Sequence, residues 1–430
     1  MLKTNINEFL TNKSIVILGF GREGKSTYKY IQDNNIKYTK LAIADRNEDI
    51  DKLDVIEYYL GEDYLNCIKD FDVIIKAPGI SLKDIDISEV KDKITSQTEL
   101  FIRFGREKII GVTGTKGKST TTSMIYEMLK MKYNVKIVGN IGLPALDYVD
   151  KFEETDYFVY ELSSHQLELV DVSPKIAVFL NLYEEHLDFY VSFEAYANAK
   201  RNIYIHQKEN DVLVYNQDMM EELLIKPAVS QKIGVSQSQA EKSDLNVDNI
   251  LGVHNIYNLT VAEAVARLLN VAEQDIQDAI KNYHTLPHRL EKIGEYGGVI
   301  FIDDSISTIP EATIKAMSSI EDIDTVLIGG MDRGINYDNL SEYLSNSRAP
   351  NIILMYESGK RIYEKMLKMI TNNNVIYAED LEKSVELAVK LTRKNKICLL
   401  SPAAASYGMF KNFEERGDKF KEYVEKYSEK

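Results

Sequence analysis

The stretch GVTGTKGKST, residues 111–120, decides how the middle of this chain folds. An apolar run, KII, precedes it, and a helical pattern follows it. Small residues let backbone N–H groups turn toward an anion, while Lys118 adds a positive charge and Ser119 a hydroxyl at a helix start. Gly111 lies one residue too far from Gly117 for the usual phosphate loop G-x-x-x-x-G-K-[ST]. The stretch therefore predicts an unusual nucleoside triphosphate site, and the alternative is a tight strand-to-helix turn with solvated lysines.

A second glycine-rich loop, GFGREGKST, occupies residues 19–27. Its G-x-G-x-x-G run follows the strand-like SIVIL, and Asp45 closes the next strand about twenty residues on, as in nucleotide-binding βαβ units. The pattern favours an NAD-dependent oxidoreductase when taken alone. However, the segment shows three clear strands, whereas a complete dinucleotide fold has about six. Half of such a fold, holding another nucleotide, is the other interpretation.

Short Val- and Ile-rich runs alternate with helical patterns along the whole chain, which is typical of parallel α/β layers. A chain of 430 residues is long enough for several domains. We predict an N-terminal half-Rossmann-like sheet over 1–103, a central phosphate-loop ATPase domain over 104–287 and a C-terminal Rossmann-like domain over 288–430. We expect the central domain to be mostly helical from about residue 183 to 285, and Thr285–Gly298 to be a hinge.

Charge and composition exclude several classes of function. The net charge of −15 and a pI near 5.1 argue against nucleic acid or an anionic membrane as partners. Neither a membrane span nor a signal peptide is recognisable, so we expect a cytoplasmic protein, and a monomer. Cys67 and Cys398 form neither a disulfide framework nor a metal knuckle.

Three residues of the central segment are candidate metal ligands. Glu161 ends the strand YFVYE, at the strand edge where α/β sheets place ligands. His186 follows the strand KIAVFLN, although a lone histidine is more often a buried structural residue. Lys200 shares a helix face with Tyr196, Ala197 and other apolar residues. A lysine on such a stripe either snorkels at its edge or has a function.

The loop G-T-K-G-K-S-T resembles the ATP loop of the Mur ligases and folylpolyglutamate synthases, which join an amino acid to a carboxylate. This resemblance implies ATP as co-substrate, two Mg²⁺ ions, and a carbamylated lysine at the position of Lys200. The implied metal ligands are Ser119, Glu161, His186 in N-x-x-x-x-H-L-D, and carbamylated Lys200, and the implied catalytic residues are Lys118, His186 and Lys200. A nucleotide-binding switch without ligase chemistry is a further alternative, which the presence of these residues disfavours.

Other segments match the Mur ligases in the same order along nearly the whole chain. The residues implied to bind ATP are Gly114, Thr115, Lys116, Gly117, Lys118, Ser119, Thr120, Asn255, Asn258, His288, Arg289 and Asp304. The family's glutamate-adding branch binds a UDP-sugar, UDP-N-acetylmuramoyl-L-alanine, with its N-terminal domain. The residues implied to bind it are Gly19, Phe20, Gly21, Arg22, Glu23, Gly24, Asp45, Arg46, Gly79, Asn140, Ser163 and Gln166.

The C-terminal stretch LLSPAAASYGMFKNFEERG is similar to the signature of the branch that adds glutamate, and implies Thr308, Arg333, Ser406, Tyr407 and Phe413 as its binding residues. Two segments depart from that branch. Members that add D-glutamate commonly read D-S-K-A-T-N where this chain has Ile306 and Ile309, and Arg333 replaces a lysine. The resemblance implies D-glutamate ligation in peptidoglycan precursor synthesis, tied to cell shape and division. L-glutamate, or a folylpolyglutamate-synthase-like reaction, remains open.

Overall fold

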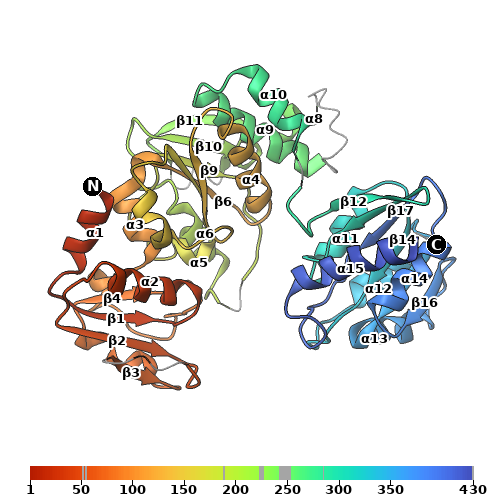
Figure 1. Cartoon of the computed structure of the whole chain (residues 1–430), viewed down its shortest axis with the longest axis horizontal. Helices are drawn as coiled ribbons and strands as arrows, with labels where there is room; N and C mark the ends of the chain where they lie inside the picture. Colours follow the sequence, from red (N-terminus) through yellow and green to blue (C-terminus); the bar gives the residue numbers. More distant parts are fainter. Residues whose placement is uncertain are drawn as a thin grey trace. The chain divides into compact units, whose positions relative to one another are not determined.

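The computed structural model describes residues 1–50, 53, 56–186, 189–221, 227–241, 253–283 and 285–428. Strands and helices alternate along these ranges and build three separate sheets (Figure 1). The chain divides into two compact units, residues 1–244 with 257–281, and residues 245–256 with 282–430. The first unit contains two of the sheets and the second contains the third, which confirms the predicted three-sheet α/β fold.

The N-terminal sheet has five parallel strands in the order β3-β2-β1-β4-β5. They are β1 (Ser14–Leu18), β2 (Lys40–Asp45), β3 (Glu57–Leu60), β4 (Val73–Lys76) and β5 (Ile94–Thr95), with helices α1 (Leu2–Leu10), α2 (Arg22–Asp33) and α3 (Gln97–Gly105). The sequence predicted β1, β2 and β4. It missed β3 and β5 because one is only half-buried and the other has two residues. Since β1 lies between β2 and β4, the loop after it occupies the point where the strand order reverses.

The central sheet has six parallel strands in the order β11-β10-β9-β6-β8-β7. They are β6 (Ile109–Thr113), β7 (Val135–Gly139), β8 (Tyr157–Glu161), β9 (Ile176–Phe179), β10 (Val212–Asn216) and β11 (Gln231–Val235), with helices α4 (Lys118–Leu129), α5 (Ser164–Leu167), α6 (Phe193–Arg201), α8 (Gln237–Glu241), α9 (Val253–Leu268) and α10 (Glu273–Lys281). The described elements after residue 183 are mostly helices, as predicted, but the sequence missed β10 and β11, which extend the sheet there. β6 again lies at the reversal of strand order, so the loop at 114–117 is placed for a ligand.

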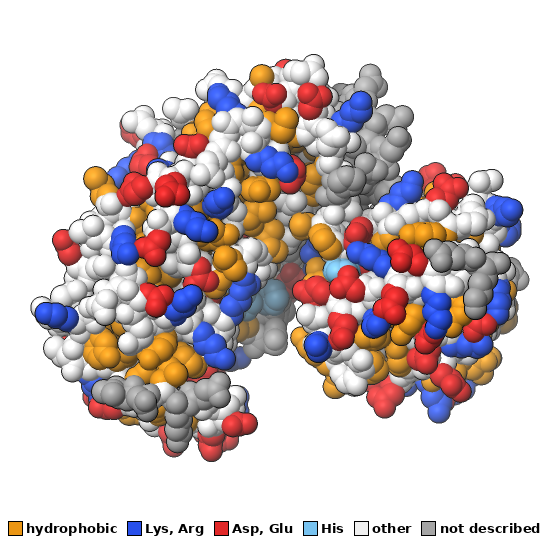
Figure 2. Space-filling view, viewed as in Figure 1, with side chains coloured by type: hydrophobic (Ala, Val, Ile, Leu, Met, Phe, Trp, Pro, Cys, Tyr) orange, Lys and Arg blue, Asp and Glu red, His pale blue; other side chains and the backbone are white. Residues whose placement is uncertain are grey.

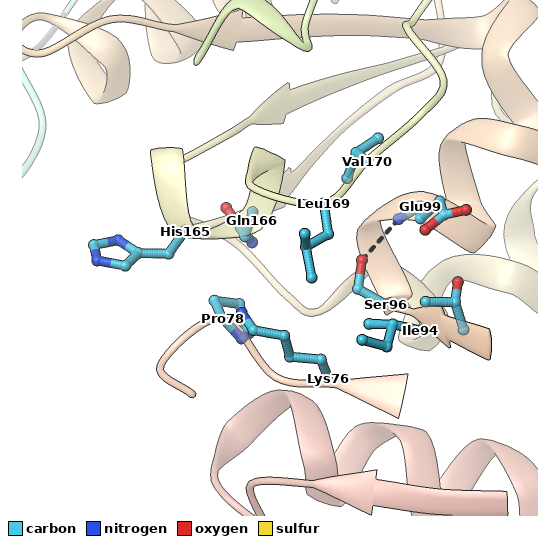
Figure 3. Close-up of a pocket in the computed structure, with 10 residues that line it drawn as sticks. Lys76, Pro78, Ile94, Ser96, Glu99, His165, Gln166, Leu169 and Val170 are labelled. Carbon is cyan, nitrogen blue, oxygen red and sulfur yellow. Dashed lines mark hydrogen bonds between the residues drawn. The ribbon is translucent and has the colours of Figure 1, made fainter. Parts of the chain in front are cut away.

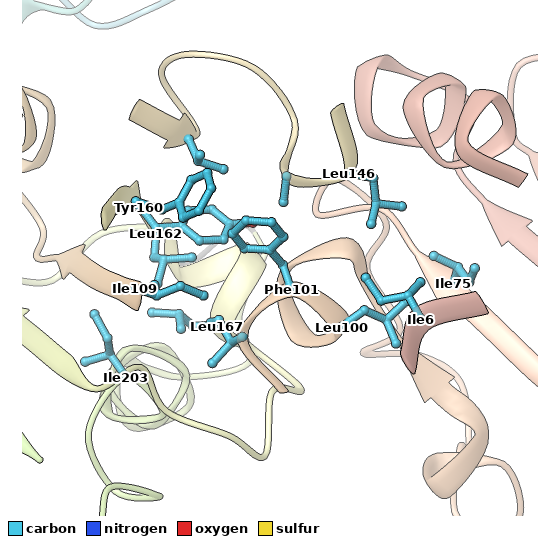
Figure 4. Packing of buried hydrophobic residues seen from close by; sticks show 14 of the residues in the cluster. Ile6, Ile75, Leu100, Phe101, Ile109, Leu146, Tyr160, Leu162, Leu167 and Ile203 are labelled. Carbon is cyan, nitrogen blue, oxygen red and sulfur yellow. The ribbon is translucent and has the colours of Figure 1, made fainter. Parts of the chain in front are cut away.

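The two sheets of the first unit share one apolar core (Figure 4). It runs from Ile6 of α1 through Leu100 of α3 to Tyr160 and Ile203 of the central part. Phe101 packs edge-on against Phe158 and Tyr160, with ring centroids 5.2 and 6.0 Å apart. Each such aromatic pair adds about 0.5–1.5 kcal/mol beyond the apolar area it buries. This common core fixes the two sheets relative to each other.

The C-terminal sheet has the order β12-β13-β17-β14-β15-β16. Its strands are β12 (Glu291–Tyr296), β13 (Val299–Asp303), β14 (Ile323–Ile328), β15 (Asn351–Met355), β16 (Asn374–Ala378) and β17 (Ile397–Leu400). β12 pairs antiparallel with β13 and the other pairs are parallel, so part of the segment predicted as a hinge is an edge strand.

Helices cover both faces of this sheet (Figure 1). One apolar layer contains side chains of α11 (Pro310–Ser319), α12 (Asp338–Ser345) and α13 (Tyr356–Met366). The other contains side chains of α14 (Leu381–Leu391) and α15 (Phe413–Ser428). Among the described residues, no helix is both long and apolar enough to cross a membrane.

Candidate active site

The phosphate loop joins β6 to α4 at the carboxyl edge of the central sheet. Gly117 has φ +86°, and a side chain there would come within 2.6 Å of the Asn258 amide oxygen, so glycine is required. The hydroxyl oxygens of Thr115 and Tyr196 lie 3.0 Å apart, and the backbone amide of Lys116 donates to the side-chain oxygen of Asn181. The loop is therefore held from behind by side chains of neighbouring elements, with Asn258 of α9 beside it.

Two lysines converge on this loop. Lys118 donates from Nζ to the carbonyls of Gly114 and Thr115, both at 3.0 Å, and Lys200 donates to the Gly114 carbonyl at 2.8 Å. Lys200 is 1% exposed and its ammonium lies over the Tyr196 ring, so it does not snorkel at the edge of its helix. Burial lowers the pKa of Lys200 well below its usual value, and the charge of Lys118 acts in the same direction. The lowered pKa favours the neutral amine, which is the form that reacts with CO₂.

Glu161 provides a carboxylate suited to a cation. It ends β8, is fully buried, and accepts a hydrogen bond from Asn140 Nδ2 at 2.7 Å on one oxygen. The other oxygen, Oε2, has no hydrogen-bond partner among the described residues. A buried carboxylate oxygen without a partner is costly unless a cation or proton satisfies it, so the residues present fit a divalent metal ion here.

His186 lies in the loop after β9 with φ +59° and a side chain 44% exposed. It is thus not a buried structural histidine. Its ring is 5.0 Å from that of His165 and 5.9 Å from that of Tyr196. Glu185, the preceding residue, forms an ion pair with Lys116 of the phosphate loop. His165 was not predicted, although it stands in the same ELSSHQLE segment as Ser163 and Gln166. The Leu-Asp of the predicted H-L-D run lies outside the described residues.

A cavity of about 360 Å³ opens between the N-terminal loop and the central domain. Of the predicted UDP-sugar residues, its lining includes Gly19, Gly21, Arg22, Glu23, Asp45, Gly79, Asn140, Ser163 and Gln166. The Phe20 amide donates to Asp45 at 2.6 Å, and a side chain on Gly24 would meet the Gly19 carbonyl at 2.0 Å. The hydrogen bond and the close backbone approach at Gly24 shape the loop, and neither Phe20 nor Gly24 lines the cavity. Arg46 is exposed beside it.

Asn140 links this cavity to the phosphate site. Its side chain lines the cavity and donates to Glu161, whose strand β8 lies next to β6. The cavity thus reaches the residue that hydrogen-bonds Glu161, on the strand next to the one that carries the phosphate loop.

In the second unit, the predicted nucleotide residues form a buried cluster below the carboxyl edge of the sheet. Asp304 accepts hydrogen bonds from Ser401 at 2.8 Å and from the Leu290 amide at 3.3 Å, and burial raises its pKa to about 6. His288 contacts Asp303 at 2.8 Å. Burial opposes the charged imidazolium, but the hydrogen bond and charge of Asp303 prevail and raise the pKa of His288.

The trio of His288, Glu291 and Asp303 brings three possible metal ligands together. Lys421 already forms an ion pair with Glu291 at 3.0 Å, so an ammonium group supplies the positive charge there. Arg289 is half-buried and interacts electrostatically with Asp304. Asn255, near the start of α9, is buried.

Of the predicted glutamate residues, Thr308, Arg333, Ser406 and Tyr407 lie on loops at the carboxyl edge of the third sheet, and Phe413 begins α15. Arg333 is exposed and donates to the Thr308 carbonyl at 3.2 Å. Ser406 is buried and Tyr407 is exposed. Arg416, which was not predicted, is fully buried and donates to the carbonyls of Ser305 and Ala404, and so ties these loops to α15.

Each of the three sheets contains residues that match a known protein family. Residues 13–96 match the family "Mur ligase MurD-like, N-terminal domain" and residues 112–248 the family "Mur ligase middle domain". Residues 293–402 match "Coenzyme F430 synthetase CfbE, C-terminal domain".

Full-length relatives extend the match over the whole chain. The chain is 33% identical to the UDP-N-acetylmuramoylalanine--D-glutamate ligase of Clostridium acetobutylicum, covering 98% of this chain and 99% of that protein. It is 32% identical to the ligases of the same name from Acetivibrio thermocellus (98% and 99%) and Ligilactobacillus salivarius (97% and 97%).

Solved structures agree in fold. The MurF ligase of Thermotoga maritima in complex with ADP aligns with a TM-score of 0.59 at 17% identity, covering 98% of this chain and 96% of that one. A pseudomurein peptide ligase type C from Methanothermus fervidus aligns with a TM-score of 0.54 at 18% identity, covering 96% and 100%.

The fold and the phosphate loop define an ATP-dependent amide-bond-forming enzyme. The chain belongs to the Mur ligase family.

Proposed function

We propose that this enzyme adds D-glutamate to UDP-N-acetylmuramoyl-L-alanine at the expense of ATP, releasing ADP and phosphate. The observation that carries the proposal is the cavity that runs from the N-terminal glycine loop to Asn140, which hydrogen-bonds Glu161 next to the phosphate loop. A UDP group on the first loop would bring the far end of its substrate to the ATP site. Full-length relatives with this activity in their name support the choice of substrates.

In the first step, an alanine carboxylate oxygen attacks the γ-phosphorus of ATP, and the bond to the β,γ-bridging oxygen breaks. An acyl phosphate and ADP result. The role of Lys118 is to move from the loop carbonyls to the phosphate oxygens and neutralise charge there. Two Mg²⁺ ions would be held by Ser119, Glu161, His186 and a carbamylated Lys200, and would supply further charge neutralisation.

In the second step, the glutamate amine attacks the acyl carbon, phosphate leaves, and the amine loses a proton as the amide forms. Arg333 and the Thr308, Ser406, Tyr407 and Phe413 loops of the second unit are the proposed glutamate site. His288, Arg289 and Asp304 are the proposed residues of that unit that act on the nucleotide. The acyl phosphate must be kept from water until the amine attacks it.

Ligation of L-glutamate is a second candidate, because Ile306 and Ile309 replace polar residues common in D-glutamate ligases. Residues 293–402, which contain both isoleucines, match the C-terminal domain of a different synthetase family.

Phosphate release measures the proposed function. We expect release from ATP only when both UDP-N-acetylmuramoyl-L-alanine and glutamate are present. Release that needs neither acceptor nor amino acid would indicate a nucleotide switch, and turnover of NADH would indicate an oxidoreductase.

A further inference from the structure

Lys76 is a buried lysine that the proposed mechanism does not use. It ends β4, at the carboxyl edge of the N-terminal sheet, and its side chain is 5% exposed. The next residues, Ala77 to Ile80, line the cavity proposed for the UDP-sugar. Figure 3 shows Lys76 and Pro78 on one side and His165, Gln166 and Leu169 of the central domain on the other. Lys76 thus lines a smaller neighbouring pocket, and two residues of that pocket, Pro78 and Gln166, also line the cavity proposed for the UDP-sugar.

Two polar contacts cross between the domains here. Lys76 Nζ forms an ion pair with Glu168 Oε2 at 3.2 Å, and Gln166 Nε2 donates to Glu23 Oε1 at 2.9 Å. Gln166 also caps its own short helix through Ser163, which itself lines the cavity. The segment Ser163–Glu168 is thus held to α2 through Gln166 and to β4 through Glu168.

Glu23 poses an electrostatic problem for an anionic ligand. It lies in the first turn of α2, lines the cavity, and its Oε2 has no hydrogen-bond partner among the described residues. A negative carboxylate at a helix start would repel a diphosphate that approaches the same helix terminus. Burial raises the pKa of Glu23, and the charge of Lys76 acts on it in the opposite direction. The hydrogen bond from Gln166 and the charge of Arg22 also lower the pKa of Glu23, but Arg22 is exposed, whereas Lys76 is buried and lines the same small pocket as Glu23.

We propose that Lys76 is a positioning residue and the buried counter-charge of the UDP-sugar site. Lys76 holds the wall of the cavity through Glu168, and it offsets the negative charge of Glu23 when a diphosphate binds. The inference rests on the proposed function only in the identity of the ligand. A nucleoside diphosphate is the chemical class of ligand that this charge arrangement favours.

The experiment compares four variants by the Kd for UDP, the KM of each substrate and the melting temperature. Lys76→Met removes the charge at similar volume, and Lys76→Arg keeps it. Lys76→Met/Glu168→Gln also removes the partner, so that no unpaired charge stays buried. Lys40→Met is the matched control, since Lys40 pairs with Glu57 at 2.8 Å at the opposite edge of the same sheet.

We expect Lys76→Met to raise the Kd for UDP and the KM for the UDP-sugar about tenfold, an effect of the size expected for a partly buried charge. The KM for ATP should stay within about twofold, because the phosphate loop is unchanged. The double variant should regain melting temperature but not UDP affinity, Lys76→Arg should keep most of the affinity, and Lys40→Met should bind UDP normally.

Recovery of both stability and affinity in the double variant would overturn the counter-charge role, and so would equal rises in all three KM values. A wild-type enzyme that fails to bind UDP at all would instead contradict the proposed function, so the two failures can be told apart.

Discussion

Lys200 combines three properties that few lysines share: it is buried, it donates to the phosphate loop, and its pKa is strongly lowered. If carbamylation turns it into a metal ligand, Lys200→Ala should lose at least about a hundredfold in turnover, within the range seen when a charge-stabilising group is removed. Acetate or another short carboxylate should restore part of the activity. Lys132→Ala, on an exposed lysine after α4, is the control. Failure of every carboxylate to rescue Lys200→Ala would contradict a carbamate.

Lys118 is the second lysine that donates to the carbonyls of the phosphate loop. Lys118→Ala should abolish ligation while the melting temperature changes by a few degrees at most, because the side chain is only half-buried and contacts loop carbonyls. Phosphate release and thermal unfolding are the two measurements. Turnover at the wild-type rate would remove the assignment of this loop to ATP.

Arg333 tests the amino-acid site. Its guanidinium is exposed, and besides its hydrogen bond to the Thr308 carbonyl it has further N–H donors that can bind a carboxylate. We expect Arg333→Ala to raise the glutamate KM by about tenfold or more, since charge-assisted contacts contribute about 1.5–3 kcal/mol. The KM for ATP and for the UDP-sugar should stay unchanged, and Arg348→Ala, an exposed arginine after α12, should have no effect. A uniform change in all three KM values would show that Arg333 is not part of the glutamate site.

At the scale of elements, the sequence predicted most of the strands that end at a site residue, but it missed β7, which ends next to Asn140. β1, β6 and β8 are apolar runs that end directly in a glycine loop or a carboxylate, so their position could be predicted from the sequence. β3, β5, β10 and β11 were missed because each is short, half-exposed or set among helical patterns. Lys76, His165 and Arg416 were also missed, since their meaning depends on contacts distant in sequence.

The packing of α2 onto the N-terminal loop depends on Gly24. A Cβ atom there would lie 2.0 Å from the Gly19 carbonyl oxygen, so the helix would have to move. We expect Gly24→Ala to cost about 1–3 kcal/mol of stability, as for other overpacked sites, and to weaken UDP binding. Urea unfolding and calorimetry measure the two effects, with Lys25→Ala on the exposed face of the same helix as control. Unchanged UDP affinity would mean that the loop does not hold the diphosphate.

The loop after β13 should make the second unit sensitive to pH. Asp304 has an ordinary pKa of 3.8, which burial raises to about 6 in the folded protein. Between these values the folded state retains a proton that the unfolded state releases, so stability falls as pH rises from about 4 to 6. The loss amounts to about 3 kcal/mol for a shift of about two units.

Asp304→Asn cannot lose this proton, so the decline between pH 4 and 6 should be smaller in that variant. Glu321→Gln, on an exposed acid of the same unit, should keep the wild-type decline. Identical pH profiles of unfolding for Asp304→Asn and the wild type would contradict the raised pKa.

At the scale of the whole molecule, each of the three sheets presents its ligand loops at the carboxyl ends of its strands. The first unit contains the cavity proposed for the UDP-sugar and the phosphate loop, on two sheets that share one apolar core, and the second unit holds the proposed glutamate site. The sequence could predict this division because each glycine-rich or charged loop follows a recognisable strand. It could not predict which glutamate enantiomer the last loops accept, because that choice depends on a few side-chain positions around the amine.

The most direct test of the central claim is the mass of the product. The enzyme is incubated with ATP, Mg²⁺ and UDP-N-acetylmuramoyl-L-alanine, and with D-glutamate and L-glutamate in separate reactions. We predict a product heavier than the UDP-sugar by one glutamyl residue, formed faster with D-glutamate than with L-glutamate. Faster formation with L-glutamate would contradict the stereochemical assignment, and no glutamyl product with either enantiomer would contradict the proposed ligation itself.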